Sequence, residues 1–149
     1  MDATDRTLIG LLQQDATQPY TELARAVHLS AAAVHERVRK LRRAGVIRRT
    51  TVEVDPAAIG AVLLAFIEID TEGWVKQPLV DAVREDPRVE DLHSIAGDTH
   101  FLAKVRVTGP QDLEELLHAL YRVKGVRNTR THVALQTYIE RLPSPRQPR

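Results

Sequence analysis

The residues best suited to charge-based chemistry are cations crowded into one short stretch of this 149-residue chain. Between Arg37 and Arg49 there are seven Lys or Arg residues and no Asp or Glu, whereas the whole chain has a formal net charge of only +1. Lys and Arg neutralise phosphates and release their counterions, so such local asymmetry favours a polyanionic partner. The competing interpretation is an ordinary solvated helix face, and the one-sided charge argues against it. We therefore expect double-stranded DNA as a partner.

Two short helices joined by a tight turn are expected to position these cations. Thr21 can cap the first helix and Ser30 the second, because each hydroxyl can accept from free backbone N–H groups of the following turn. Residues 31–44 carry an apolar stripe at spacings of four and three, which predicts a buried face formed by Val34, Val38 and Leu41. Gly45 follows where a left-handed residue commonly ends a helix. With another amphipathic helix over residues 4–14, the N-terminal part is predicted to be a three-helix unit.

This arrangement is typical of helix-turn-helix DNA-binding units, in which the first turn of the second helix meets base edges. The residues expected near base edges are Ser30, Ala32, Ala33, His35 and Glu36. Those expected at phosphates are Arg37, Arg39, Lys40 and Arg43, and Thr21 completes the DNA-binding set. Glu36 could accept from a cytosine amino group, but an intrahelical pair with Lys40 is the favoured alternative. His28 stands where such motifs often have Gly, so we expect a positive φ there.

The remainder of the chain predicts the order strand, helix, strand, strand, helix, strand. The expected ranges are 61–71, 74–85, 89–96, 99–107, 111–123 and 126–139. A βαββαβ order of this size predicts a four-stranded antiparallel sheet with both helices on one face, a ferredoxin-like α+β fold. The other face would be left bare, and exposed apolar area there would mark an oligomer contact.

Four segments are thus expected. They are a helix-turn-helix domain over 1–47, a hinge strand or linker over 48–60, a ferredoxin-like domain over 61–140 and a disordered, Pro-rich tail over 141–149.

Composition excludes several classes of site. The chain has no cysteine, which removes disulfides, thiolate metal sites and cysteine nucleophiles. No stretch near Met1 resembles a signal peptide and no apolar run reaches the roughly 18 residues of a membrane span, so a cytoplasmic protein without membrane contact is expected. Neither His93 nor His100 has metal-type spacing, and Ser30 and His35 form no catalytic triad with an Asp. We expect no catalytic residues, no metal and no cofactor.

Short motifs spread over residues 2 to about 140 resemble the Lrp/AsnC (feast/famine) family of regulators. They are Asp5-Arg6, Leu8-Ile9-Gly10-Leu11-Leu12, Glu22-Leu23-Ala24, Leu29-Ser30, Arg37-Val38, Gly45-Val46-Ile47, Ala96-Gly97-Asp98, Gly125-Val126 and Thr129-Arg130-Thr131. Each motif is weak alone, but their order and spacing make the resemblance specific. It implies a transcriptional regulator whose C-terminal domain, of the RAM/AsnC type, binds a small-molecule effector such as an amino acid. It also implies homodimers that assemble into tetramers or octamers, with the effector where dimers meet.

The implied effector site centres on the turn around Gly97. The expected residues are Ala96, Gly97, Asp98, Thr99, His100, Phe101, Thr129 and Thr131. Backbone N–H groups of the turn could meet a carboxylate and the threonines could supply hydroxyls. From the residues alone a plain β-turn is the favoured interpretation, and the resemblance reverses this preference. Family members often have Asp where this chain has His100, and a neutral imidazole supplies no negative charge for an ammonium group. An amino acid in a shifted pose, another effector, or no effector remain open.

Two other classes of function stay in view. An architectural protein that binds DNA without an effector would share every feature except the ligand site. Siroheme decarboxylases resemble the same family in both halves, and His93, His100 and His132 could hold a carboxylated tetrapyrrole. The intact basic helix argues against such an enzyme, which would have no use for it.

Overall fold

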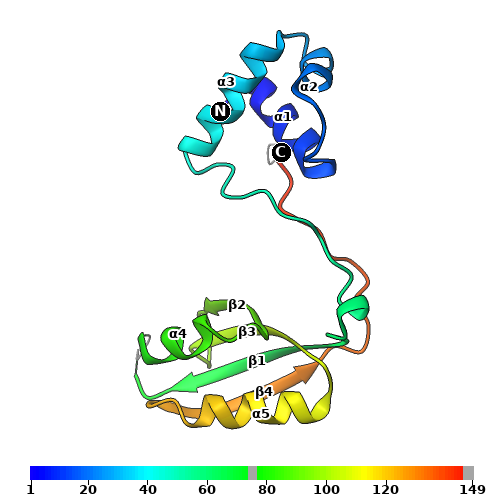
Figure 1. The fold of residues 1–149 in the computed structure, drawn as a ribbon. Coiled ribbons are helices and arrows are strands. Elements are labelled where there is room, and N and C mark those ends of the chain that lie inside the picture. The colour runs from blue at the N-terminus through cyan, green and yellow to red at the C-terminus, as the bar shows by residue number, and fades with distance from the viewer. Residues whose placement is uncertain (74–76, 146–149) are drawn as a thin grey trace. The chain divides into compact units, whose positions relative to one another are not determined.

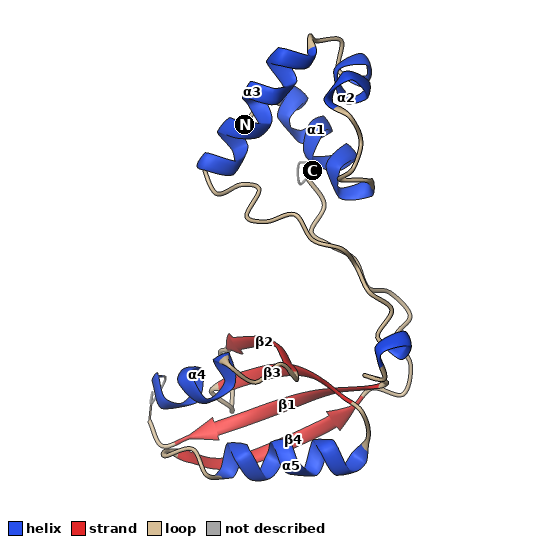
Figure 2. Cartoon of the chain, viewed as in Figure 1, coloured by secondary structure: helices blue, strands red, loops and turns tan. Residues whose placement is uncertain are grey.

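The computed structural model describes residues 1–73 and 77–145, which divide into two compact units (Figure 1). One unit combines Met1–Glu53 with the C-terminal segment from Glu140 onward, and the other spans Val54–Ile139. The first is helical, and the second contains the sheet with two helices (Figure 2). The α+β class is confirmed.

The helical unit contains α1 (Ala3–Gln14), α2 (Tyr20–Ala26) and α3 (Ala31–Arg43). Helix α1 starts with a reciprocal cap, since the Asp2 carboxylate accepts from the Asp5 backbone N–H at 2.8 Å and Asp5 accepts from the Asp2 N–H at 3.1 Å. Apolar residues of all three helices form its core, namely Leu8, Leu23, Ala24, Val34 and Val38. The stripe predicted from the 31–44 spacing is buried, as expected.

The backbone at the ends of α2 and α3 agrees with the sequence predictions at His28 and Gly45 and differs from them at Thr21. His28 adopts φ +55°, so the predicted left-handed conformation is confirmed. Thr21 does not cap α2, because the helix already starts at Tyr20 and Pro19 holds the N-cap position. The Pro19 carbonyl accepts from the N–H groups of Glu22 and Leu23, which leaves Thr21 inside the first turn. Beyond α3, Gly45 has φ +70°, as the sequence indicates.

The segment expected to be a hinge strand has no regular secondary structure over residues 48–55. Its β-branched character suggests a strand, but a strand forms only where a neighbour supplies ladder hydrogen bonds, and this segment is outside the four-stranded sheet. Val52 and Val54 are accordingly exposed. A 3₁₀ turn, Ala57–Ile59, follows and ends at Gly60 with φ +77°.

The sheet unit contains β1 (Leu63–Thr71), α4 (Gln77–Arg84), β2 (Val89–Ser94), β3 (Phe101–Val107), α5 (Pro110–Tyr121) and β4 (Val126–Val133). The strand order is β2-β3-β1-β4 and every pair is antiparallel, so the ferredoxin-like prediction is confirmed. Strand β4 ends at Val133 rather than near Ile139, since pairing with β1 stops at Ala65. The beginning of the helix expected over 74–85 lies outside the described residues.

Both helices pack on one face of this sheet (Figure 2). Alternate residues of β1 and β3 point into this layer, where Ile67, Ile69 and Val105 are fully buried. Helix α4 contributes Leu79 and Val83 to the same core, and α5 contributes Leu113, Leu116 and Leu120.

No described helix covers the opposite sheet face, yet this face is not the exposed apolar area expected of a bare sheet face. Glu68 accepts from Arg130 on β4 at 3.0 Å, and its other oxygen lies 3.0 Å from His132. A β-bulge after Val89 brings Glu90 within 2.9 Å of Lys104 and 2.6 Å of Arg106. The apolar residues among these charges are Leu64, Phe66 and Leu102. The uncovered face is therefore largely polar, because its long side chains pair across neighbouring strands.

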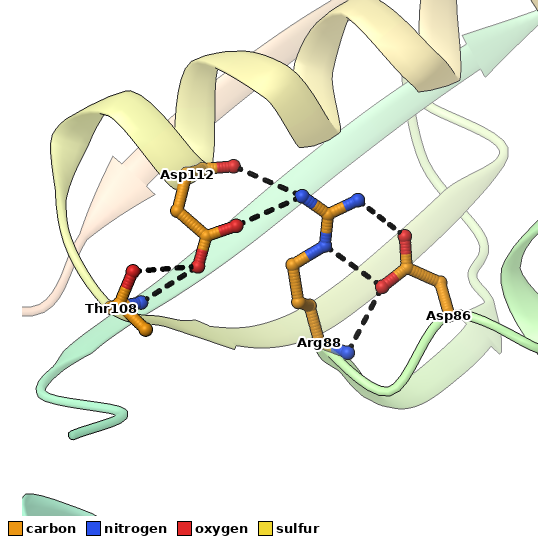
Figure 3. A network of polar contacts seen from close by, with 4 residues as sticks. All are labelled: Asp86, Arg88, Thr108 and Asp112. Carbon is orange, nitrogen blue, oxygen red and sulfur yellow. Dashed lines mark hydrogen bonds and ion pairs between the residues drawn. The ribbon is translucent and has the colours of Figure 1, made fainter.

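An ion-pair network around Arg88 connects the loop before β2 to the start of α5 (Figure 3). The Arg88 guanidinium donates to Asp86 at 2.6 Å and to the Asp112 carboxylate at 2.9 Å. Asp112 also accepts from the backbone N–H of Thr108 at 2.8 Å, just before the helix. The hydrogen bond from Arg88 lowers the pKa of Asp86 below its usual value, and the Thr108 N–H followed by Arg88 lowers the pKa of Asp112.

The segment after residue 139 contacts α1 in the helical unit, although residues 141–149 are expected to be disordered. Gln13 donates to the Pro143 carbonyl at 3.0 Å, and Arg6 donates to the Pro145 carbonyl at 3.2 Å. A Cβ placed on Gly10 would lie 3.6 Å from the Pro145 ring, so the proline packs where α1 has no side chain. The Pro-rich composition does not reveal this contact, because α1 and not the tail supplies the donors.

Candidate DNA interface and effector site

Helix α3 presents one stripe of side chains directly opposite its buried stripe. Its members follow one another at spacings of four, three and four residues, and are Ala32, Glu36, Arg39 and Arg43. All four are exposed, whereas Val34 and Val38 on the other side are fully buried. This stripe is the part of α3 that a groove of DNA could receive.

The first turn of α3 has a small, smooth surface. The Ser30 hydroxyl accepts from the Ala33 backbone N–H at 3.2 Å, so the predicted N-cap is present. Ala32 is exposed and Ala33 is half-buried, and neither has a side chain long enough to hold DNA away from the backbone. Thr21 is also exposed, on the first turn of α2.

His35 lies beside the stripe and is held by an aromatic contact. Its ring meets Tyr20 edge to face, with 5.3 Å between the ring centroids and an interplanar angle of 82°. Tyr20 is the first residue of α2, so the pair joins the beginnings of the two helices. The imidazole remains exposed and keeps its hydrogen-bonding atoms available for a base edge.

Arg37, which is expected at a phosphate, pairs with two acids of α1 and its cap in the DNA-free protein. Its guanidinium lies 2.7 Å from Asp2 and 2.8 Å from Asp5, the two residues that cap α1. The hydrogen bond with Asp2, then that with Asp5, raises the pKa of Arg37 above its usual value. Arg37 therefore ties α3 to the start of α1. The sequence pattern does not reveal this pairing, because the two acids are more than thirty positions away from Arg37.

Glu36 pairs with two arginines of its own stripe and not with Lys40. One carboxylate oxygen lies 2.5 Å from Arg39 and the other 3.0 Å from Arg43. The expected Glu36–Lys40 pair is therefore replaced by pairs at spacings of three and seven. Two of the cations assigned to phosphates are thus engaged by a carboxylate in the DNA-free protein.

Lys40 and Arg42 complete the cation set of α3. Both are exposed, and no described residue forms a hydrogen bond or ion pair with either side chain. Arg42 is missing from the residues expected at DNA, although its position in the basic run is the same signal that identifies Lys40. Each is well placed to meet a phosphate without first breaking an ion pair.

The segment between β2 and β3 is longer than the tight turn expected from Gly97-Asp98. Six residues, 95–100, connect the strands, and the Ile95 N–H donates to the His100 carbonyl at 3.1 Å to close the loop. Gly97 has φ +139°, which favours glycine, and an added Cβ would meet no atom within 4 Å. Ala96, Gly97 and Asp98 are exposed at the loop tip, with Thr99 half-buried beside them.

His100 is linked to the end of β1, and this brings in a residue that the sequence interpretation missed. Its Nδ1 lies 2.9 Å from the Asp70 carboxylate and 3.2 Å from the Thr71 backbone N–H. These contacts require opposite states of the nitrogen, because a protonated Nδ1 donates to Asp70 and an unprotonated Nδ1 accepts from Thr71. Asp70 brings a second negative charge to the loop that carries Asp98, and its carboxylate directly contacts His100. The strand alternation over 61–71 indicates the face of Asp70 but not its pairing.

Three other residues expected at the effector site are not brought to this loop. Phe101 is 2% exposed in the core beneath the helices, because it begins β3 on the covered face. Thr129 hydrogen-bonds to the Tyr121 hydroxyl of α5 at 3.1 Å. Thr131 pairs with Ile67, and β1 separates it from β3. The loop with Asp70 and these β4 threonines thus form two separate groups within the chain.

The described part of the chain has no assembled set of metal ligands. No group of three or more His, Cys, Asp or Glu side chains there could hold a metal ion. His93 pairs with Leu102 in the β2–β3 ladder, whereas His100 contacts β1. Among the helices described, none is long and apolar enough to cross a membrane.

Comparison with known families divides the chain as the two folds do. Residues 1–42 match the AsnC-type helix-turn-helix domain. Residues 64–143 match the Lrp/AsnC ligand binding domain, which alone covers more than half of the chain.

Relatives of known sequence or structure match over nearly the whole length. The HTH-type transcriptional regulator FL11 of Pyrococcus horikoshii is 30% identical over 94% of this chain and 93% of its own. The leucine-responsive regulatory protein of Klebsiella pneumoniae is 34% identical over 91% of this chain and 85% of its own. The crystal structure of the Mycobacterium tuberculosis leucine response regulatory protein superposes with a TM-score of 0.83 at 31% identity, covering 99% and 98% of the two chains. These similar proteins are transcriptional regulators and not enzymes.

Proposed function

Because this chain belongs to the Lrp/AsnC family of DNA-binding transcriptional regulators, we propose that it binds specific operators through α3 and changes this binding when an amino acid occupies its sheet unit. The observation that carries the first half is the capped, exposed stripe of α3. It is flanked by Lys40 and Arg42, whose side chains have no ion-pair partner among the described residues. A charged, small-residue helix start of this kind suits major-groove contact.

The DNA-binding set follows from the contacts on α3. Ser30, Ala32, Ala33 and His35 are proposed at base edges, because they surround the exposed first turn. Lys40 and Arg42 are proposed at phosphates, with Arg39 and Arg43 joining them once Glu36 releases them. Arg37 is left out of this set, since it is committed to Asp2 and Asp5.

The proposed effector is a free amino acid held at the 96–100 loop. The match to a ligand-binding domain and the names of the two leucine-responsive relatives support this class of ligand. The loop backbone around Gly97 would receive the carboxylate, and Asp70 would face the ammonium group beside His100. In this proposal Asp70 takes over the charge that His100 does not provide.

We further propose that two copies pair, so that two α3 helices reach half-sites about 34 Å apart on one side of the duplex. Thr129 and Thr131 would contact effector only if a second copy brings its β4 to the loop, because β1 separates them within one chain. Effector would then shift the population between assemblies that hold different promoters.

The test is an electrophoretic shift titration on the DNA upstream of the protein's own gene, with and without each amino acid in turn. Binding altered by one amino acid would support the regulator and name its effector. Binding indifferent to all of them would replace the effector proposal with an architectural role.

A matched pair of variants examines the loop. Asp70→Asn should abolish the response to that amino acid and leave effector-free DNA binding unchanged, because Asp70 lies outside the helical unit. Asp91→Asn on β2, an equal charge change at an exposed residue outside the loop, is the control. If calorimetry gives the same effector affinity for Asp70→Asn and wild type, the placement at Asp70 is wrong.

A further inference from the structure

A carboxylate occupies the centre of the surface that should meet DNA. Glu36 is the single acidic residue in the sequence of α3, and it lies on the exposed stripe between Ala32 and Arg39. Since DNA is a dense array of negative phosphates, an acid at this place opposes binding to any sequence. Its presence there calls for a physical reason.

Both oxygens of this carboxylate already contact cations. One oxygen lies 2.5 Å from a guanidinium nitrogen of Arg39, and the other lies 3.0 Å from a guanidinium nitrogen of Arg43. Two side chains that could each reach a phosphate are therefore held against one negative charge. Arg37 shows the opposite arrangement, in which one guanidinium satisfies two carboxylates away from the exposed stripe.

These ion pairs contribute little to the stability of the fold. The three side chains are between 53% and 64% exposed, and pairs so open to solvent are weak and easily exchanged. A phosphate can consequently replace the carboxylate, but the carboxylate remains on the same helix and repels it. The cluster thus lowers the net attraction between α3 and the DNA backbone while leaving the shape of the helix unchanged.

We infer that Glu36 is a specificity-determining residue, because it holds Arg39 and Arg43 and so weakens binding to DNA of arbitrary sequence. This inference rests on the proposed contact of α3 with DNA. A regulator must find its operator among a vast excess of other sites, so the ratio of operator to non-operator affinity matters more than either affinity alone. The base contacts made by the first turn of α3, whose residues do not pair with Glu36, then determine the preference for the operator.

The experiment compares wild type with Glu36→Gln on two duplexes, the upstream operator and an unrelated sequence of equal length. Fluorescence anisotropy between about 50 and about 200 mM salt gives the affinity and its salt slope. We expect Glu36→Gln to bind the unrelated duplex about tenfold more tightly, with a slope steeper by about one to two phosphate contacts. The gain on the operator should be smaller, so the ratio between the two affinities falls.

Two controls separate this effect from others. Glu115→Gln removes the same charge from an exposed position of α5 that has no polar partner among the described residues, and it should leave both affinities unchanged. Adding Glu36→Gln to a protein that already carries Arg39→Gln and Arg43→Gln should tighten binding less than Glu36→Gln does in wild type, because only the direct repulsion between the carboxylate and the phosphates is then relieved. Circular dichroism establishes that each variant retains its helices.

The other outcomes overturn the inference. If Glu36→Gln and Glu115→Gln behave alike, the carboxylate does not restrain the arginines. If Glu36→Gln weakens only operators with a cytosine at one position, Glu36 reads that base directly. If wild-type protein binds neither duplex in a salt-dependent manner, the proposed contact of α3 with DNA is wrong. The role inferred for Glu36 is then wrong as well.

Discussion

Each of the two units uses an arginine held between two acids at the beginning of a helix, but the settings differ. Arg37 joins α3 to the capping acids of α1, and its side chain is 35% exposed. Arg88 joins the loop before β2 to the first turn of α5, and its side chain is 24% exposed between two acids that are 17% and 23% exposed (Figure 3). The ion-pair network around Arg88 is less exposed, so it should contribute more to the free energy of unfolding than the network around Arg37, because solvent replaces lost partners less readily there.

The largest effect is expected from Arg88→Met, which keeps most of the aliphatic stem and removes the charge. Asp86 and Asp112 would be left close together without their cation, so the sheet unit should lose about 2 kcal/mol of its free energy of unfolding. Hydrogen exchange of the buried β3 amides reports on this unit alone.

Arg127→Met on β4 is the matched control, since Arg127 is exposed and has no polar partner among the described residues. Equal exchange rates in the two variants would mean that the ion-pair network around Arg88 adds nothing to stability.

A second effect concerns acid. The pKa values of Asp86 and Asp112 are below the usual 3.8, so these carboxylates stabilise the folded state above that value and lose this contribution as the pH falls through the lowered pKa values. The free energy of unfolding of the sheet unit should therefore fall between about pH 5 and about pH 2. Arg88→Met should reduce this fall, mainly through Asp86, because Thr108 still donates to Asp112. Urea titrations across this range measure it, and an unchanged pH profile in the variant would contradict the assignment.

The smallest effect separates structural from DNA-contacting cations on α3. Lys40→Met should flatten the salt dependence of DNA binding by about one unit, because it removes a cation whose side chain has no polar partner in the described part of the DNA-free protein. Arg37→Met should leave this slope unchanged and lower the melting temperature of the helical unit, since its guanidinium is already held by two acids. A flatter slope in Arg37→Met would show that Arg37 leaves those acids to meet a phosphate.

The comparison also shows which parts of the molecule a sequence can predict. Local patterns were sufficient for the helices, for the Ser30 cap and for the left-handed His28, because each depends on residues within a few positions. The strand order followed as well, since a βαββαβ sequence of this length allows few arrangements.

Partners brought together by the fold were beyond these patterns. The Asp2 contact with Arg37 and the Asp70 contact with His100 join segments far apart in the chain. The character of the uncovered sheet face also differed from expectation, since Glu68 and Arg130 pair on it and make it polar where a bare face was expected to expose apolar area. Spacing indicates the face on which a residue lies, but not which charge from another element will meet it.

The contact of the tail with α1 has a consequence for chain order. Because the helical unit contains both the first fifty-three residues and the segment from Glu140, the sheet unit is an insertion within it. During synthesis the whole ferredoxin-like sheet leaves the ribosome before Pro143 and Pro145 can reach Gln13 and Arg6. The sheet unit can therefore fold before this contact forms, and the surface of α1 around Gly10 is covered only after the sheet unit has been synthesised.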